Sequence, residues 1–165
     1  MPPPPGMSPP ALVTWTDQPS PVKFAGMSFT PAQQARVLML ADLILRGSHG
    51  DIGRGGFARE VGSRIELVDV AVCERPEDGK MHAEVACEID VHEDMLNAGG
   101  NLHGGCTMFM IDVCSSVTLH VLGIARGLQS SLVSQAITTV FHAPAAMRLV
   151  ATGIHNQMAP SEPKL

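Results

Sequence analysis

The sequence predicts a protein of the α+β class, in which strands pack against one long helix. Residues 81–91 alternate apolar and polar side chains, the pattern of a strand with one buried face. Residues 102–125 form a run without proline and with few polar residues, which indicates a helix that is buried on most of its faces. A segment rich in β-branched residues follows at 131–142 and predicts a further strand. The order is therefore strands, a long helix and then more strand.

The length of 165 residues suits one domain with a buried core. Residues 1–26 hold most of the prolines and show no apolar periodicity, so we expect them to be disordered. The domain is expected to span residues 27–154, and residues 155–165 are expected to form a polar tail.

The first helix is predicted to begin at Thr30-Pro31, because threonine is a favourable N-cap and proline suits the first helical position. Gly47 is a natural end for it. Between them lies an apolar stripe at helical spacing, formed by Val37, Leu40, Ala41, Ile44 and Leu45. The glycine-rich loop 50–56 lacks the order of a phosphate-binding loop, which argues against a nucleotide site there.

Strands are expected at 60–73, with a bulge near 67–69 where the apolar phase slips, and at 81–91. The segment 74–80 between them has the composition of a hairpin loop. After 131–142, only residues 147–154 still resemble a strand.

The stretch from Asn97 to Asp112 contains the residues that could bind a ligand or act in catalysis. Gly104 and Gly105 stand in the first turn of the long helix, where backbone N–H groups lack intrahelical partners and can bind a carbonyl oxygen or an anion. Asp112 follows inside an apolar segment. Desolvation there is expected to raise the pKa of the carboxyl and to make it a stronger base.

The spacing of Asn97, His103-Gly104-Gly105 and Asp112 resembles the signature of hotdog-fold acyl-CoA thioesterases, of the phenylacetate-pathway and mammalian "thioesterase superfamily member" type. The likeness covers residues 31–150 and implies a hotdog fold, a curved antiparallel sheet wrapped around the long helix. The family continues with two longer strands after the third strand, so the C-terminal strands of this chain are expected to be incomplete.

The resemblance also implies the roles of individual residues. The Gly104 N–H polarises the thioester carbonyl, Asn97 positions the thioester or the water, and His103 shapes the pocket. Asp112 is the general base or nucleophile, and Ser134 holds the water or the carboxylate. Structural interpretations stay open: a turn residue at 97, a hydrogen-bonded histidine at 103, a core carboxylate at 112 and an ordinary strand serine at 134.

Four residues are candidates for substrate binding. Gly105 adjoins the expected carbonyl site, and Met108 lines an acyl tunnel or belongs to the plain core. Arg126 and Arg148 are candidates for the phosphates of coenzyme A, because of their charge and their placement near helix or strand ends.

The spacing of Gly104 and Asp112 predicts a site shared between subunits. Eight residues of helix separate them by about 12 Å, whereas a base must come within about 3 Å of the water that it activates. We therefore expect Asn97, His103 and Gly104 from one chain and Asp112 and Ser134 from another, and the family resemblance implies that these chains form a homodimer or homotetramer.

Composition argues against several other classes. The net charge is −5 and the 11 Lys and Arg residues are scattered, so no nucleic-acid partner is expected. The 4 cysteines form no C-x-x-C pair and the 7 histidines lack ligand spacing, so no metal is expected. No cofactor is expected beyond the coenzyme A of the substrate.

Location is inferred from the same features. Reduced cysteines and the lack of a secretory signal favour an intracellular protein, with the cytoplasm preferred and a mitochondrial location left open. Polar residues within 107–125 favour a core helix and not a membrane span.

Two function classes follow. The first is an acyl-CoA thioesterase without metal or covalent cofactor. The second is a non-catalytic or degenerate hotdog subunit that binds acyl groups or a partner subunit. Hydration of enoyl-CoA ranks lower, because the Asp/His arrangement that it uses is not found.

Overall fold

The computed structural model describes residues 22–47, 57–128, 133–141 and 151–158, the last range by its backbone alone. In chain order the elements are β1 (Lys23–Gly26), α1 (Pro31–Arg46), α2 (Arg59–Gly62), β2 (Glu66–Glu74) and β3 (Met81–Glu88). They continue with a 3-10 turn (Glu93–Met95), α3 (Gly104–Ala125), β4 (Val133–Phe141) and β5 (Ala151–Met158). The class is α+β, as predicted, with a curved sheet that does not close around one long helix.

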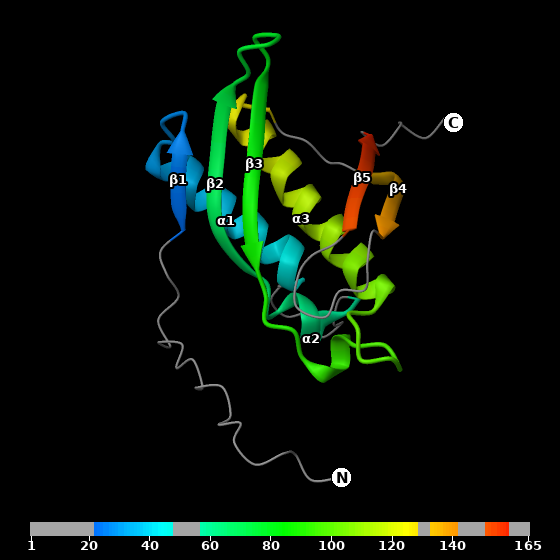
Figure 1. The fold of residues 1–165 in the computed structure, drawn as a ribbon. Helices are drawn as coiled ribbons and strands as arrows, with labels where there is room; N and C mark the ends of the chain where they lie inside the picture. Colours follow the sequence, from blue (N-terminus) through cyan, green and yellow to red (C-terminus); the bar gives the residue numbers. More distant parts are fainter. Residues whose placement is uncertain (1–21, 48–56, 129–132, 142–150, 159–165) are drawn as a thin grey trace, which may run out of the picture.

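The described strands form two separate sheets. The first has the order β1-β2-β3, with β1 parallel and β3 antiparallel to β2, and the second pairs β4 with β5 antiparallel. In Figure 1 the first sheet stands on the left, α3 runs across behind it, and β4 and β5 lie on the right. The long helix is thus the element that both sheets share.

Helix α1 forms for the local reasons visible in its sequence. The Thr30 side chain and the Gln33 side chain cap each other's backbone N–H groups in a capping box. Gly47 ends the helix in the left-handed conformation (φ 64°), and its N–H donates to the Leu43 carbonyl. Both predicted boundaries are confirmed.

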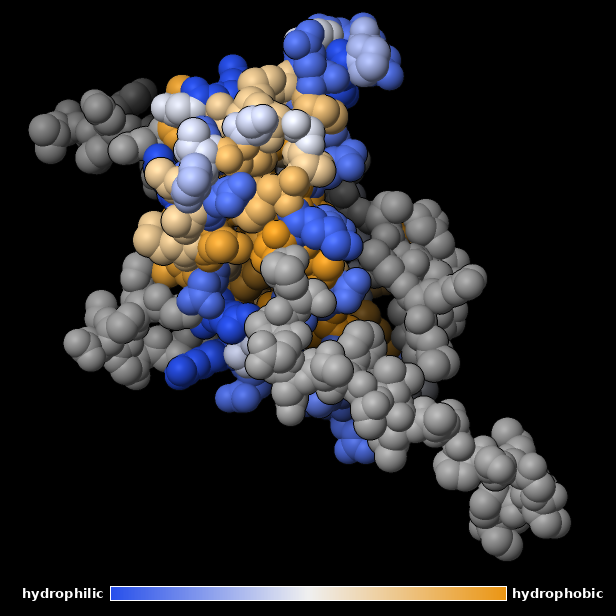
Figure 2. Space-filling model, turned by 90° about the vertical axis from the view of Figure 1, so that its left-hand side faces the viewer, coloured by the Kyte–Doolittle hydropathy of each residue, from blue (hydrophilic) through white to orange (hydrophobic). Residues whose placement is uncertain are grey.

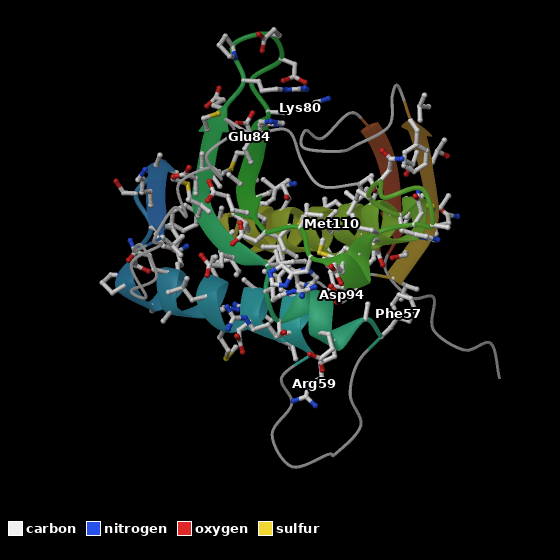
Figure 3. The ribbon with its side chains drawn as sticks, turned by 60° about the horizontal axis from the view of Figure 1, so that its bottom comes forward. Phe57, Arg59, Lys80, Glu84, Asp94 and Met110 are labelled. Carbon is white, nitrogen blue, oxygen red and sulfur yellow. The ribbon has the colours of Figure 1, made fainter. Side chains whose placement is uncertain are left out.

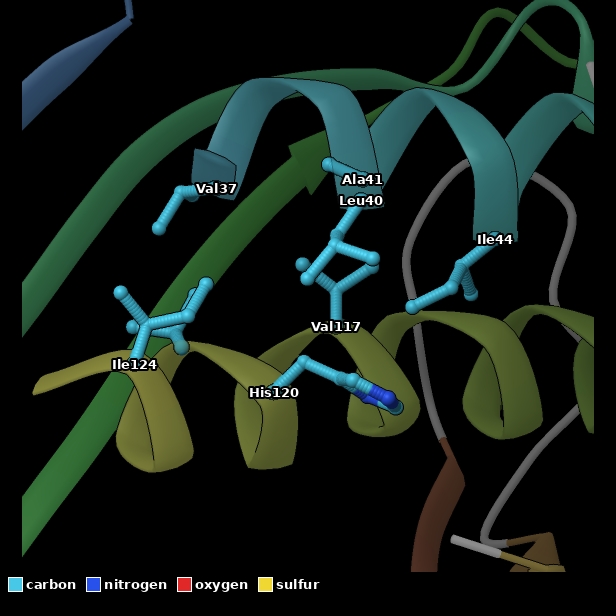
Figure 4. Close-up of a pocket in the computed structure, with 8 residues that line it drawn as sticks. Val37, Leu40, Ala41, Ile44, Val117, His120 and Ile124 are labelled. Carbon is cyan, nitrogen blue, oxygen red and sulfur yellow. The ribbon is translucent and has the colours of Figure 1, made fainter. Parts of the chain in front are cut away.

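The core lies between helices α1 and α3 and the first sheet. Val117, Val121 and Ile124 of α3 are buried against the α1 stripe, and Figure 4 shows the facing side chains, His120 among them. The first sheet contributes Val70 and Val72 of β2 to this core, and both are fully buried. On the face that carries β1 and α1, apolar side chains gather in the middle, and hydrophilic ones cover the β2–β3 turn at the top (Figure 2).

The prediction that α3 is buried on most of its faces is wrong for the described structure. Only 6 of its residues are buried: Thr107, Val113, Val117, Val121, Gly123 and Ile124. The remaining positions are intermediate or exposed, because two unjoined sheets and α1 do not surround the helix. By length and composition α3 would also suffice to cross a membrane, which is weak evidence, since the core helix of a soluble protein passes the same test.

The start of the domain differs from the expectation. Residues 23–26, assigned to a disordered segment, form β1 and pair with residues 69–72 of β2. The ring of Phe24 packs edge-on against Phe29 at 5.4 Å between centroids. Gly26, at φ 78°, ends β1 where a side chain would collide with the Val72 carbonyl. The strand is held by this sheet edge and has little local signal.

Other boundaries shift as well. The predicted strand 60–73 begins with helix α2, and Figure 3 shows Arg59 at its start pointing away from the molecule. The bulge near 67–69 is confirmed by the register shift between Leu67 and Asp69. The third strand falls within 131–142 as predicted, but the last strand continues past 154, so four residues of the expected polar tail pair with β4.

Candidate functional site

The loop before α3 is folded by Asn97. The side-chain oxygen of Asn97 accepts hydrogen bonds from the N–H groups of Gly99 (2.9 Å) and Asn101 (3.2 Å). The Asn97 N–H in turn donates to the Asn101 carbonyl at 2.7 Å. These bonds form the kind of side-chain turn that asparagine favours. The hydrogen bonds agree with the interpretation of Asn97 as a turn residue, and its side-chain NH₂ group has no acceptor among the described residues.

His103 is the N-cap of α3. Its Nδ1 accepts from the Gly105 N–H at 3.0 Å, and its own N–H donates to the Met95 carbonyl at 2.8 Å. Because Nδ1 accepts, the ring proton sits on Nε2. His103 is exposed, so it is not the buried histidine of the structural interpretation, and its structural role is that of a helix cap.

Gly104 is the first helical residue, and Phe141 of β4 lies against it. A Cβ added at Gly104 would meet Cζ of the Phe141 ring at 3.3 Å, which is tighter than ordinary contact. Glycine therefore allows β4 to approach the start of α3 closely. The Gly105 N–H is engaged by His103, whereas the Gly104 N–H has no acceptor within the described ranges.

Asp112 and Ser134 are brought together. The Ser134 hydroxyl donates to Oδ1 of Asp112 at 3.0 Å, across 22 positions of sequence. Asp112 is half-buried, not deeply buried as expected, and Ser134 is exposed. The serine hydroxyl donates to the carboxylate and so fixes the orientation of the Asp112 side chain.

A bulge in β4 explains why Ser134 meets the helix. The register with β5 shifts between Ser134 and Ala136, so Ser134 shares a face with Ile137, Thr139 and Phe141. One end of this face touches Asp112 and the other end touches Gly104. Strand β4 therefore lies along the N-terminal half of α3.

The 3-10 turn ahead of the loop is braced by an ion pair. Both carboxylate oxygens of Asp94 accept from Arg64 at 2.9 Å, which ties the turn to the segment before β2. Figure 3 shows Asp94 next to α2. The position of the Asn97 loop thus depends on a contact with the segment that leads into β2.

The remaining candidates are scattered. Met108 lies on α3 one turn after Gly104 and is 38% exposed. Arg126 is the C-cap of α3 and lies at the opposite end of the helix, about 33 Å from Gly104 at 1.5 Å per residue. Arg148 lies outside the described residues.

Gly104 and Asp112 belong to one continuous helix, so the separation of about 12 Å along its axis stands. Within the described ranges no group of three or more His, Cys, Asp or Glu side chains is placed to hold a metal ion. All four cysteines are free, and Cys87 of β3 contacts Cys114 of α3 thiol to thiol. That contact lowers the pKa of Cys87 and raises the pKa of Cys114, because the Cys114 thiol donates the hydrogen bond.

Known proteins give no further guide. Neither family models nor characterised proteins nor solved structures match the chain. The residues themselves must therefore carry any assignment.

Two residues next to the site, Phe141 and Thr139, were not predicted from the sequence. Phe141 covers Gly104, and Thr139 shares its face of β4. Strict alternation from Ser134 would place both on the opposite face, and only the bulge reverses this. A run of β-branched residues gives no sign of where a bulge falls.

Proposed function

We propose that this chain is a hotdog-type acyl-CoA thioesterase, which hydrolyses an acyl-CoA to a free acid and coenzyme A. The observation that carries the proposal is the hydrogen bond from Ser134 to Asp112. The motif resemblance selects these two residues for their roles, and the fold places them in contact although 22 positions separate them. A chance likeness of sequence would give no reason for this contact.

The chemistry uses the groups found at the two ends of the β4 face, one end from each of two chains. Asp112 takes a proton from water while the water oxygen bonds to the thioester carbon. The Gly104 N–H, at the positive end of α3, stabilises the negative oxygen of the tetrahedral intermediate. The C–S bond then breaks, the acid is released, and the coenzyme A thiolate takes up a proton.

The separation along α3 supports a site that two chains share. Asp112 and Ser134 of one chain would face the Asn97 loop and Gly104 of another, because about 12 Å within one helix is too far for a single water. The homo-oligomer, a dimer or tetramer, is part of the proposal.

The test compares wild type with Asp112→Asn on medium-chain, long-chain and aromatic acyl-CoAs. The amide keeps the shape of the carboxylate but is not a base, so kcat should fall by about 10²–10⁴-fold while melting temperature changes little. Asp90→Asn is the matched control, since Asp90 is exposed and lies outside the site. Equal turnover of wild type and Asp112→Asn would exclude Asp112 as the base.

The shared site has its own test. Asn97→Ala and Asp112→Asn chains should each be inactive and should regain activity when mixed and allowed to exchange subunits. The recovered activity comes from mixed oligomers with one intact site. No recovery after verified exchange would contradict a shared site.

A non-catalytic subunit is the second candidate, and the two unjoined sheets favour it. Strand edges that lack neighbours readily accept a strand from another chain. This candidate predicts stable binding of acyl-CoA or a partner without release of coenzyme A.

A further inference from the structure

The hydroxyl oxygen of Thr139 is buried and has no hydrogen-bond partner among the residues that the structure describes. Only one other side-chain atom in the described ranges shares this state, Nε of Arg64, whose guanidinium already donates twice to Asp94. Thr139 has no second polar side-chain atom to compensate. Native proteins rarely leave a buried hydroxyl unsatisfied, so this group requires an explanation, and a role in catalysis is one of those known.

The position of Thr139 suggests what the hydroxyl meets. The β4–β5 register places Thr139 on the face that Ser134 and Phe141 share. Phe141 is two residues away and touches Gly104, whereas Ser134 is five residues away and bonds Asp112. Thr139 therefore belongs to the Gly104 end of this face.

We propose that the Thr139 hydroxyl is a second donor to the acyl carbonyl oxygen of the substrate, beside the Gly104 N–H. This inference rests on the proposed thioesterase function. The carbonyl oxygen is the hydrogen-bond acceptor of a thioester. Because the negative charge on this oxygen grows in the tetrahedral intermediate, two donors stabilise the transition state more than they stabilise the bound substrate. The Phe141 ring, 51% exposed, is the side chain that gives way when the acyl group enters.

Thr139→Val separates this role from a structural one. Valine keeps the shape of threonine and removes the unsatisfied hydroxyl, so the melting temperature should rise by about 2–6 °C. At the same time kcat should fall by about 10²-fold, the effect of losing one oxyanion donor. Thr139→Ser keeps the hydroxyl and should retain most of the activity. Thr138→Val, at the exposed neighbour on the opposite face, is the control and should change neither quantity.

A binding measurement separates this proposal from the thioesterase assignment. Two stable probes are used, a 2-oxoalkyl-CoA that keeps a carbonyl and an alkyl-CoA thioether that lacks it. Wild type should prefer the carbonyl probe, and Thr139→Val should reduce this preference by about 5–20-fold, since one hydrogen bond of this kind contributes about that factor.

Each outcome decides. A wild type that turns over acyl-CoA while Thr139→Val does so equally well overturns the role of Thr139 and leaves the thioesterase standing. A wild type without turnover whose carbonyl preference depends on Thr139 supports the inference and overturns hydrolysis. Absence of both turnover and preference overturns both. A lower melting temperature for Thr139→Val shows a structural partner for the hydroxyl and also overturns the inference.

Discussion

The contact between Ser134 and Asp112 can be tested without any substrate. Ser134→Ala, Asp112→Ala and the double variant form a double-mutant cycle, which isolates the energy of the pair from all other effects of each change. The isolation matters here because Asp112 has a further interaction besides the bond from Ser134. Alanine is used because asparagine would still accept the hydrogen bond.

The expected coupling follows from the geometry. A hydrogen bond of 3.0 Å to a carboxylate contributes about 1.5–3 kcal/mol when it is shielded from water. Here Ser134 is exposed and Asp112 is half-buried, so competition from water reduces the coupling to about 1 kcal/mol. The free energy of unfolding of the four proteins would be measured by urea titration.

A cycle that pairs Ser134→Ala with Asp90→Ala is the control and should give no coupling. A value for Ser134 and Asp112 below about 0.3 kcal/mol, the ordinary scatter of additive pairs, would refute the placement of β4 along α3. The assignment of both residues to one site would fall with it, whatever the enzyme assays show.

Two further predictions concern contacts away from the site. Gly62→Ala should lower the free energy of unfolding by about 3 kcal/mol, because the new Cβ would lie 2.2 Å from the Leu45 carbonyl oxygen and the main chain would have to move. Urea unfolding measures this loss, and a change under about 0.5 kcal/mol would contradict the prediction. Cys114→Ala should slow alkylation of Cys87 by iodoacetamide at about pH 8, because loss of the donated hydrogen bond raises the pKa of Cys87 and reduces its thiolate fraction. Peptide mass mapping follows the rate, with the exposed Cys73 as internal standard. Faster alkylation of Cys87 would argue against the thiol contact.

Elements with local signals were predictable. The capping pair at Thr30 and Gln33 fixes the start of α1, and Gly47 fixes its end, through bonds that span a few residues. The alternation in β3 and the phase slip at 67–69 likewise follow from neighbouring side chains. In each case the interaction that forms the element lies within the segment that the sequence displays.

Elements that depend on a distant partner were not predictable. Strand β1 exists because the edge of β2 is available to it, and nothing within Lys-Phe-Ala-Gly demands a strand. The last four residues of β5 are strand because β4 is long enough to pair with them.

The candidate site divides in the same way. The residue order alone identified two groups that could take part in catalysis, a glycine start to a long helix and a carboxylate eight positions later, and the family resemblance added a serine on a following strand. The three-dimensional arrangement shows that the side-chain acceptors of Asn97 and His103 bind backbone N–H groups, in the loop and at the start of α3 respectively. The fold also turns Ser134 toward Asp112 through the β4 bulge and leaves the hydroxyl oxygen of Thr139 buried, with no hydrogen-bond partner among the described residues. The physical reason is that strand register is set by pairing between segments, and a shift of one residue changes which side chains face the helix.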